Sequence, residues 1–139
     1  MISYTYNTDF ILPNEKLFSD WITNVITSES YVLGEINYTF CNDEFLHDIN
    51  IEYLNHDTLT DIITFDNSVG FTLHSDIVIS IERVIDNAND FNVSFEEELK
   101  RVIIHGILHL CGYKDKSHND SILMRNKENE KILMFHMEH

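Results

Sequence analysis

Two periods of hydrophobic residues recur along this 139-residue chain. Apolar side chains take alternate positions at residues 2–6 and 36–40, and β-branched runs occur at 61–65 and 76–81, which predicts four strands. Elsewhere apolar residues return every three or four positions, which predicts amphipathic helices. The predicted helices cover about residues 14–27, a segment starting at 42–43, a segment between Ser94 and Gly112, and residues 119–136.

The helix that follows Ser94 has the clearest boundaries. Ser94 and Glu97 form a capping box at its start, and Gly112 suits the left-handed backbone that often ends a helix. Elements of these lengths, with no repeat and no linker between them, predict one domain over residues 1–139. The expected fold class is α+β, with a four-stranded mixed sheet packed with helices.

Composition supports a folded chain and argues against export. Hydrophobic residues make up 43% of the sequence and there are only 4 Gly and 1 Pro, which opposes disorder. The N-terminus has no basic segment before an apolar run, so neither a signal peptide nor a membrane span is expected. Cys41 and Cys111 do not form a CxxC pair, which fits a reducing cytoplasm.

The net charge of −15 is unevenly distributed. Residues 1–99 hold 2 cations against 19 acids, whereas residues 100–139 hold 7 cations against 5 acids. A strongly acidic chain repels nucleic acid, so any contact with phosphates is expected to come from the C-terminal segment. A solvated helical face explains the same pattern equally well.

The segment HGILHLCGYKD at 105–115 carries the candidate chemistry. His105 and His109 are four residues apart, so their rings lie on one helix face and can share a metal, although such pairs often serve ordinary structural roles. Gly112 and Asp115 continue the metzincin-like spacing HxxxHxxGxxD, in which the helix breaks and the chain returns to supply a third ligand. Two imidazoles and one carboxylate suit zinc and leave an open position for water.

Gly106 stands where HExxH peptidases carry their general base. Its presence argues against a peptidase, while a metal can still support hydrolysis by polarising a phosphoryl oxygen and acidifying a bound water. A metallopeptidase-like hydrolase therefore remains only as an alternative, with a carboxylate from another segment replacing the glutamate.

Three segments carry a family resemblance. HGILHLCGY at 105–113 resembles HGxLHLxGY of the YbeY endoribonucleases, and SDIVIS at 75–80 resembles that family's GDIxIS. NIEYLNHDTLTDIITF at 50–65 is similar to NxxYRxxDxPTDVLSF. The shared positions of this third segment are Asn50, Tyr53, Asp57, Thr60, Asp61 and Phe65.

The resemblance implies a cytoplasmic, zinc-dependent endoribonuclease specific for single-stranded RNA, with one zinc per chain. It further implies a role in 16S rRNA 3′ end maturation and ribosome quality control, with ribosomal RNA and the small ribosomal subunit as partners. No DNA or membrane partner is expected. A non-enzymatic ribosome assembly factor with a structural zinc is a second alternative.

The departures from the family pattern affect the expected site. Asp115 replaces the family's third histidine and His118 follows three residues later, so His105, His109 and Asp115 are the predicted ligands, with His118 as the competitor. Leu54 replaces the family arginine, which leaves the general base unidentified. Either the metal activates water unaided or the RNA 2′-hydroxyl is the nucleophile.

Three cations lie near the predicted ligands. Lys114 and Lys116 flank Asp115, and Arg101 precedes His105 by one helical turn. These residues are the predicted contacts to RNA phosphates, with Arg125, Lys127 and Lys131 as the next candidates.

Overall fold

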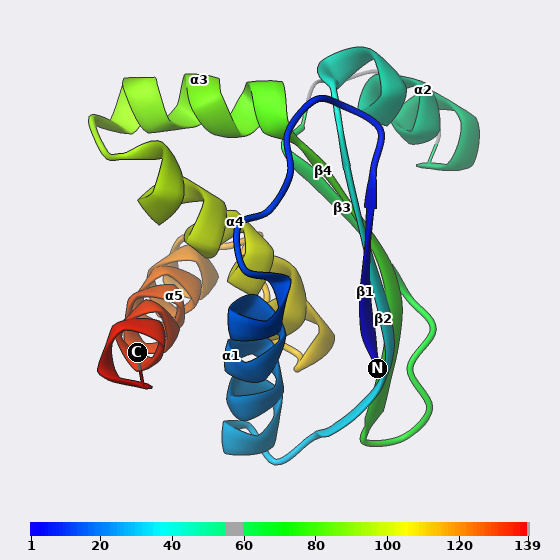
Figure 1. The fold of residues 1–139 in the computed structure, drawn as a ribbon. Coiled ribbons are helices and arrows are strands. Elements are labelled where there is room, and N and C mark those ends of the chain that lie inside the picture. The colour runs from blue at the N-terminus through cyan, green and yellow to red at the C-terminus, as the bar shows by residue number, and fades with distance from the viewer. Residues whose placement is uncertain (55–59, 139) are drawn as a thin grey trace.

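The computed structural model describes residues 1–54 and 60–138 (Figure 1). Its elements in chain order are β1 (Ile2–Tyr6), α1 (Glu15–Ser28), β2 (Val32–Cys41), α2 (Asp43–Leu54), β3 (Ile62–Asp66), β4 (Thr72–Ser80), α3 (Ile81–Phe91), α4 (Phe95–Leu110) and α5 (His118–Glu138). None of the helices in this described part is long and apolar enough to span a membrane.

The four strands form one mixed sheet in the order β1-β2-β4-β3. β1, β2 and β4 run parallel, whereas β3 pairs antiparallel with β4, so the predicted α+β class and mixed sheet are confirmed. β3 begins beside the C-terminal ends of β2 and β4. There the Ser80 amide donates to the Asp61 carbonyl at 2.9 Å. This end of the sheet lies beside the predicted metal-binding segment.

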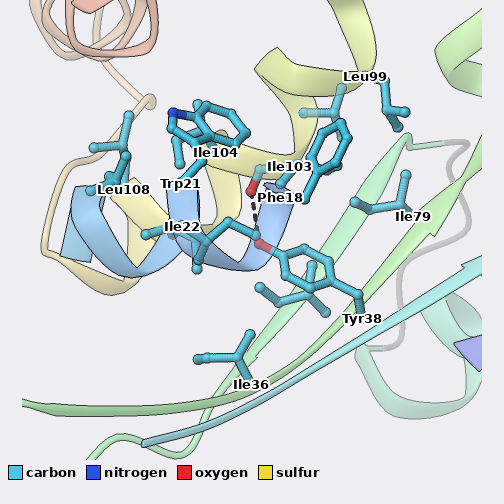
Figure 2. Packing of buried hydrophobic residues seen from close by; sticks show 14 of the residues in the cluster. Phe18, Trp21, Ile22, Ile36, Tyr38, Ile79, Leu99, Ile103, Ile104 and Leu108 are labelled. Atoms are coloured by element: carbon cyan, nitrogen blue, oxygen red, sulfur yellow. Dashed lines mark hydrogen bonds between the residues drawn. The ribbon is translucent and has the colours of Figure 1, made fainter. Parts of the chain in front are cut away.

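Helices cover both faces of the sheet. In Figure 1, α1 and α4 lie on one side of the strands and α2 lies on the other, with α5 packed outside α4. Successive side chains of β4 point to opposite faces of the sheet, and each face carries a hydrophobic core. Ile77 and Ile79 belong to the larger core, under α1 and α4, and Val78 belongs to the smaller core, under α2. Figure 2 shows the buried Tyr38 hydroxyl donating to the Ile103 carbonyl, at 3.1 Å, which ties the sheet to α4.

α3 is the one described helix that the sequence patterns did not predict. Ser80, taken as part of a strand ending at Ile81, accepts a hydrogen bond from the Arg83 amide and caps α3 instead. The buried residues Ile81, Val84 and Ala88 have helical spacing, but the polar residues between them obscured it. β4 also begins at Thr72, four residues before the predicted start, because its first half is less apolar.

Candidate metal centre

α4 presents the two histidines on its partly exposed face. Ser94 caps the helix by accepting from the Glu97 amide at 3.1 Å, as predicted. The side chains of His105 and His109 are 21% and 42% exposed, and their ring centroids are 5.4 Å apart. Because the opposite face of α4 is buried in the core, the helix fixes both rings toward the same cleft.

A sharp turn after α4 brings Asp115 back to the histidines. Gly112 has φ 98, a left-handed conformation that L side chains rarely adopt. The turn is held at both ends, since the Tyr113 hydroxyl donates to Glu29 Oε1 at 2.6 Å and the Ser121 hydroxyl donates to the Asp115 carbonyl at 3.1 Å. The Asp115 carboxylate is therefore placed by backbone geometry.

The predicted ligand atoms converge. His105 Nε2 lies 3.3 Å from Asp115 Oδ2, and His109 Nε2 lies 3.8 Å from Asp115 Oδ1. Ligands about 2.0–2.2 Å from a tetrahedral zinc are about 3.3–3.6 Å apart, so the first separation matches such an ion and the second is slightly longer. Within residues 1–54 and 60–138, His105, His109 and Asp115 are the one such group of donors, and it does not include His118.

A buried carboxylate, Glu128 of α5, binds the other nitrogen of His105. His105 Nδ1 donates to Glu128 Oε2 at 2.7 Å, and Arg101 Nη1 donates to Glu128 Oε1 at 3.0 Å. Arg101 Nη2 also donates to Asn129 Oδ1 at 2.9 Å. The Glu128 side chain is only 6% exposed, so it holds the His105 ring in the orientation that leaves Nε2 for a metal.

Sequence reasoning missed Glu128, although one pattern pointed to it. Met124, Glu128, Ile132 and Phe135 repeat at helical spacing along α5, and all four are buried. A carboxylate within an apolar stripe needs a charged or hydrogen-bonding partner, which here comes from α4. The partner could not be identified because it lies on another helix.

The charges of this network reinforce one another. Burial acts to lower the pKa of His105, but the hydrogen bond to Glu128 and the nearby carboxylates raise it above its ordinary value. Burial acts to raise the pKa of Glu128, but hydrogen bonds from His105 and Arg101 hold it below its ordinary value. Glu128 therefore stays ionised and favours a proton on Nδ1 of His105.

Two cavities meet at the candidate metal centre. One, of about 330 Å³, lies among α3, α4 and α5, and the other, of about 380 Å³, lies among α2, β3 and α4. Both are lined by His105 and Asp115, and His109 lines the second. The donor group therefore lies at the junction of the two cavities.

Asp61 also lines both cavities, just before β3 begins. Its Oδ2 accepts a hydrogen bond from Asn87 Nδ2 at 3.2 Å, and burial raises its pKa although the neighbouring His105 opposes the shift. A carboxylate in this place can accept a proton from a group bound in either cavity. In the sequence, Asp61 stood out only as a position shared with the family segment at 50–65.

The remaining predicted site residues are placed unequally. Lys114 and Lys116 are exposed beside Asp115, whereas the Arg101 side chain is 15% exposed and is bound to Glu128. Leu54, at the position of the family arginine, lines the second cavity. Asp57, a shared motif position, lies outside the described residues.

These features define an α+β domain with a candidate His₂-carboxylate metal centre at the junction of two cavities. A family model described as endoribonuclease YbeY matches residues 4–136. The chain belongs to this family.

Relatives named endoribonuclease YbeY align over nearly the whole chain. The protein of Flavobacterium johnsoniae is 66% identical over 138 residues, 99% of each chain. That of Flavobacterium psychrophilum is 59% identical over 99% of this chain and 98% of the relative. A solution structure from Thermotoga maritima is 25% identical with a TM-score of 0.66, covering 99% of this chain and 91% of that one. The resemblance found in the three sequence segments is thus confirmed.

Proposed function

We propose that this protein is a zinc-dependent endoribonuclease that cleaves single-stranded RNA in 16S rRNA 3′ end maturation and ribosome quality control. One observation carries the proposal: His105, His109 and Asp115 converge at the junction of two cavities in a chain of the endoribonuclease YbeY family. Ribosomal RNA and the small ribosomal subunit are the proposed partners, and the cytoplasm is the proposed location.

Zinc is the proposed ion, held by the metzincin-like helix and turn. Two imidazoles favour zinc over magnesium or calcium, and donor separations of 3.3 and 3.8 Å are close to those of tetrahedral coordination with one position open. Zinc bound there would stabilise negative charge on a phosphoryl oxygen and lower the pKa of water toward about 7. Glu128 contributes by fixing the His105 ring.

Asp61 is the proposed proton acceptor, a role the sequence left unassigned. It lines both cavities, so it adjoins a nucleophile bound in either one, whether that is water or the RNA 2′-hydroxyl. The proton moves to Asp61 as the new P–O bond forms and the old one breaks. Burial, which raises the pKa of Asp61, strengthens it as a base.

The test is cleavage of an unstructured RNA by purified protein. Wild type should cut the RNA, a chelator should stop it, added zinc should restore it, and casein should stay intact. His105→Ala, prepared identically, controls for contaminating nucleases. Equal cleavage by the variant and wild type would overturn the enzymatic proposal. If chelation then lowers only the melting temperature, the zinc is structural and the assembly-factor alternative holds.

Asp61→Asn separates the proton acceptor from the metal centre. The amide keeps the shape of the side chain and cannot take the proton, so kcat should fall by about 10²- to 10⁴-fold while zinc content stays at wild-type level. Asp66→Asn, at the other end of β3, is the matched control and should keep wild-type kcat. An unchanged kcat in Asp61→Asn would remove Asp61 from the mechanism.

A further inference from the structure

The two cavities beside the metal centre differ in their lining. A phosphodiester joins two nucleosides, so a phosphate bound at the metal centre would direct one nucleoside toward each cavity. This step rests on the proposed function. The cavity between α2, β3 and α4 offers hydroxyl and amide groups from Asn50, Thr60 and Thr64. The cavity among α3, α4 and α5 offers instead an aromatic ring and a buried carboxylate.

The aromatic ring is Phe91, at the last position of α3. It is 57% exposed and lines the cavity, where it could otherwise have packed into the core as the ring of Phe95 does. An exposed ring beside a cavity of about 330 Å³ offers a planar surface to a planar ligand. Nucleobases stack on such rings, gaining binding free energy in a largely sequence-independent way.

The buried carboxylate is Glu98, on the first turn of α4. The residue is 4% exposed and lines the same cavity. Within the part of the chain that the structure describes, no group donates a hydrogen bond to its carboxylate, and no side-chain oxygen there is both fully buried and unbonded, so the Glu98 oxygens remain open to the cavity. A ligand that enters the cavity displaces the water around this carboxylate, so its N–H groups must replace the lost hydrogen bonds, and a ligand that carries such groups is favoured.

Charge inside this cavity disfavours phosphate. Arg101 is already bound to Glu128, and Asp61 and Glu98 add negative charge to the lining. Arg125 also lines the cavity but is 52% exposed, and its Nε lies 4.0 Å from Glu128 Oε1. The interior thus suits a neutral ring with donor groups, while Arg125 can meet the adjacent phosphate.

We infer that the cavity among α3, α4 and α5 is a nucleobase subsite next to the scissile phosphate, in which the base stacks on Phe91 and donates to Glu98. Adenine, cytosine and guanine each present an exocyclic amino group to such an acceptor. Uracil has no amino group and can donate only its ring N3–H, so it binds less well. The subsite therefore gives the enzyme a base preference on one side of the cleaved bond.

Cleavage mapping on RNA with all four bases tests the subsite. Wild type should prefer amino-bearing bases over uracil at one nucleotide beside the cut. Phe91→Ala should raise KM about tenfold or more, and Glu98→Gln should flatten the base preference, with zinc content unchanged in both. Ile85→Ala, an exposed apolar residue of α3 outside the cavity, and Glu97→Gln, exposed beside Glu98, are the matched controls and should behave as wild type.

A second experiment tests nucleotide binding in the cavity without RNA cleavage. In NMR titrations, guanosine 5′-monophosphate should shift amide resonances of α3 and the start of α4 in wild type, more strongly than uridine 5′-monophosphate does. Phe91→Ala should weaken these shifts about tenfold, and Ile85→Ala should not. If RNA cleavage equals that of His105→Ala but these shifts occur, the proposed function fails and the subsite stands. Wild-type base preference and wild-type shifts in both Phe91→Ala and Glu98→Gln would overturn the subsite.

Discussion

The two nitrogens of the His105 ring face different partners, with Nδ1 bound to Glu128 of α5 and Nε2 beside Asp115 at the candidate metal centre. Nδ1 is bound to Glu128 at 2.7 Å, and Nε2 lies 3.3 Å from Asp115. A neutral imidazole can ligate a metal only through its unprotonated nitrogen. Because Glu128 favours the proton on Nδ1, it leaves Nε2 as the nitrogen that can bind a metal. His109, which is more exposed, would be a less constrained ligand.

Alanine substitutions should identify the ligands. His105→Ala, His109→Ala and Asp115→Ala each remove one of three donors, so each should reduce bound zinc from about one per chain to a small fraction of that. His118→Ala is the control, because His118 begins α5 outside the donor group, and should keep its zinc. Elemental analysis of the purified proteins measures this. Zinc retained in Asp115→Ala and lost in His118→Ala would falsify the assignment.

Glu128→Gln should weaken zinc binding without removing a ligand. The neutral amide no longer favours the proton on His105 Nδ1, and we expect about 10- to 100-fold lower zinc affinity, measured by competition with a chromophoric chelator. Glu130→Gln is the matched control, since Glu130 lies on the same helix and is 54% exposed. Affinity equal to wild type in Glu128→Gln would show that the contact only packs α5.

Sequence spacing could reveal ligands on one segment but not the contacts that orient them. His105, His109 and Asp115 lie within eleven consecutive residues, so helix and turn geometry alone brings them together. Glu128 follows His105 by 23 residues, and Asp61 comes from a different edge of the fold. Those two positions depend on how α5 and β3 pack against α4, which no local pattern encodes.

At the scale of elements, Gly106 sets how closely α4 lies on the sheet. A Cβ at this position would meet Ile62 Cδ1 at 3.1 Å and Thr64 Oγ1 at 3.2 Å, both on β3. The residue therefore faces the strands, and a glutamate there would need space that the sheet occupies. This packing supports the view that the site does not use the HExxH arrangement of peptidases.

Gly106→Ala should lower the free energy of unfolding by about 1 kcal/mol. Overpacking costs about 1–3 kcal/mol, which outweighs the roughly 1 kcal/mol gained from the better helix propensity of alanine. Ile62→Val removes the nearest atom, so the double variant should be more stable than the sum of the single changes predicts. Urea unfolding of the wild type, the two single variants and the double variant measures these free energies and the coupling between the two positions. A stabilised Gly106→Ala with no coupling to Ile62 would contradict this packing.

The elements that the sequence predicted well are those with strong local signals. α4 has a capping box and a glycine at its end, and the four strands have alternating or β-branched runs. α3 follows β4 without any loop, because Ser80 both ends the strand and caps the helix. A boundary of this kind has no turn residues between the strand and the helix. The sequence pattern therefore gave no sign that a helix begins there.

At the scale of the whole molecule, few cations are available to a ligand. Among residues 100–138 that the structure describes, Lys127 and Lys131 pair with Glu29 at the end of α1 and with Glu130 on α5 itself. Arg101 pairs with Glu128. Lys114 and Lys116 have no ion pair in the described part and flank Asp115, so they remain the cations nearest the metal centre that are free to meet phosphates.

The salt dependence of RNA binding should show whether Lys114 and Lys116 contact RNA phosphates. With two phosphate contacts, from Lys114 and Lys116, log affinity for a short unstructured RNA should fall against log salt with a slope of about −1.4, at roughly 0.7 per contact. Lys114→Ala and Lys116→Ala should each reduce the magnitude of the slope by about 0.7 and keep their zinc. Arg101→Ala should act differently, by losing zinc affinity, because the guanidinium supports Glu128. Lys16→Ala, an exposed lysine of α1 paired with Asp20, is the control and should leave the slope unchanged. Wild-type slopes in both lysine variants would place the RNA path elsewhere, with Arg125, which lines the cavity among α3, α4 and α5, as the next cation to test.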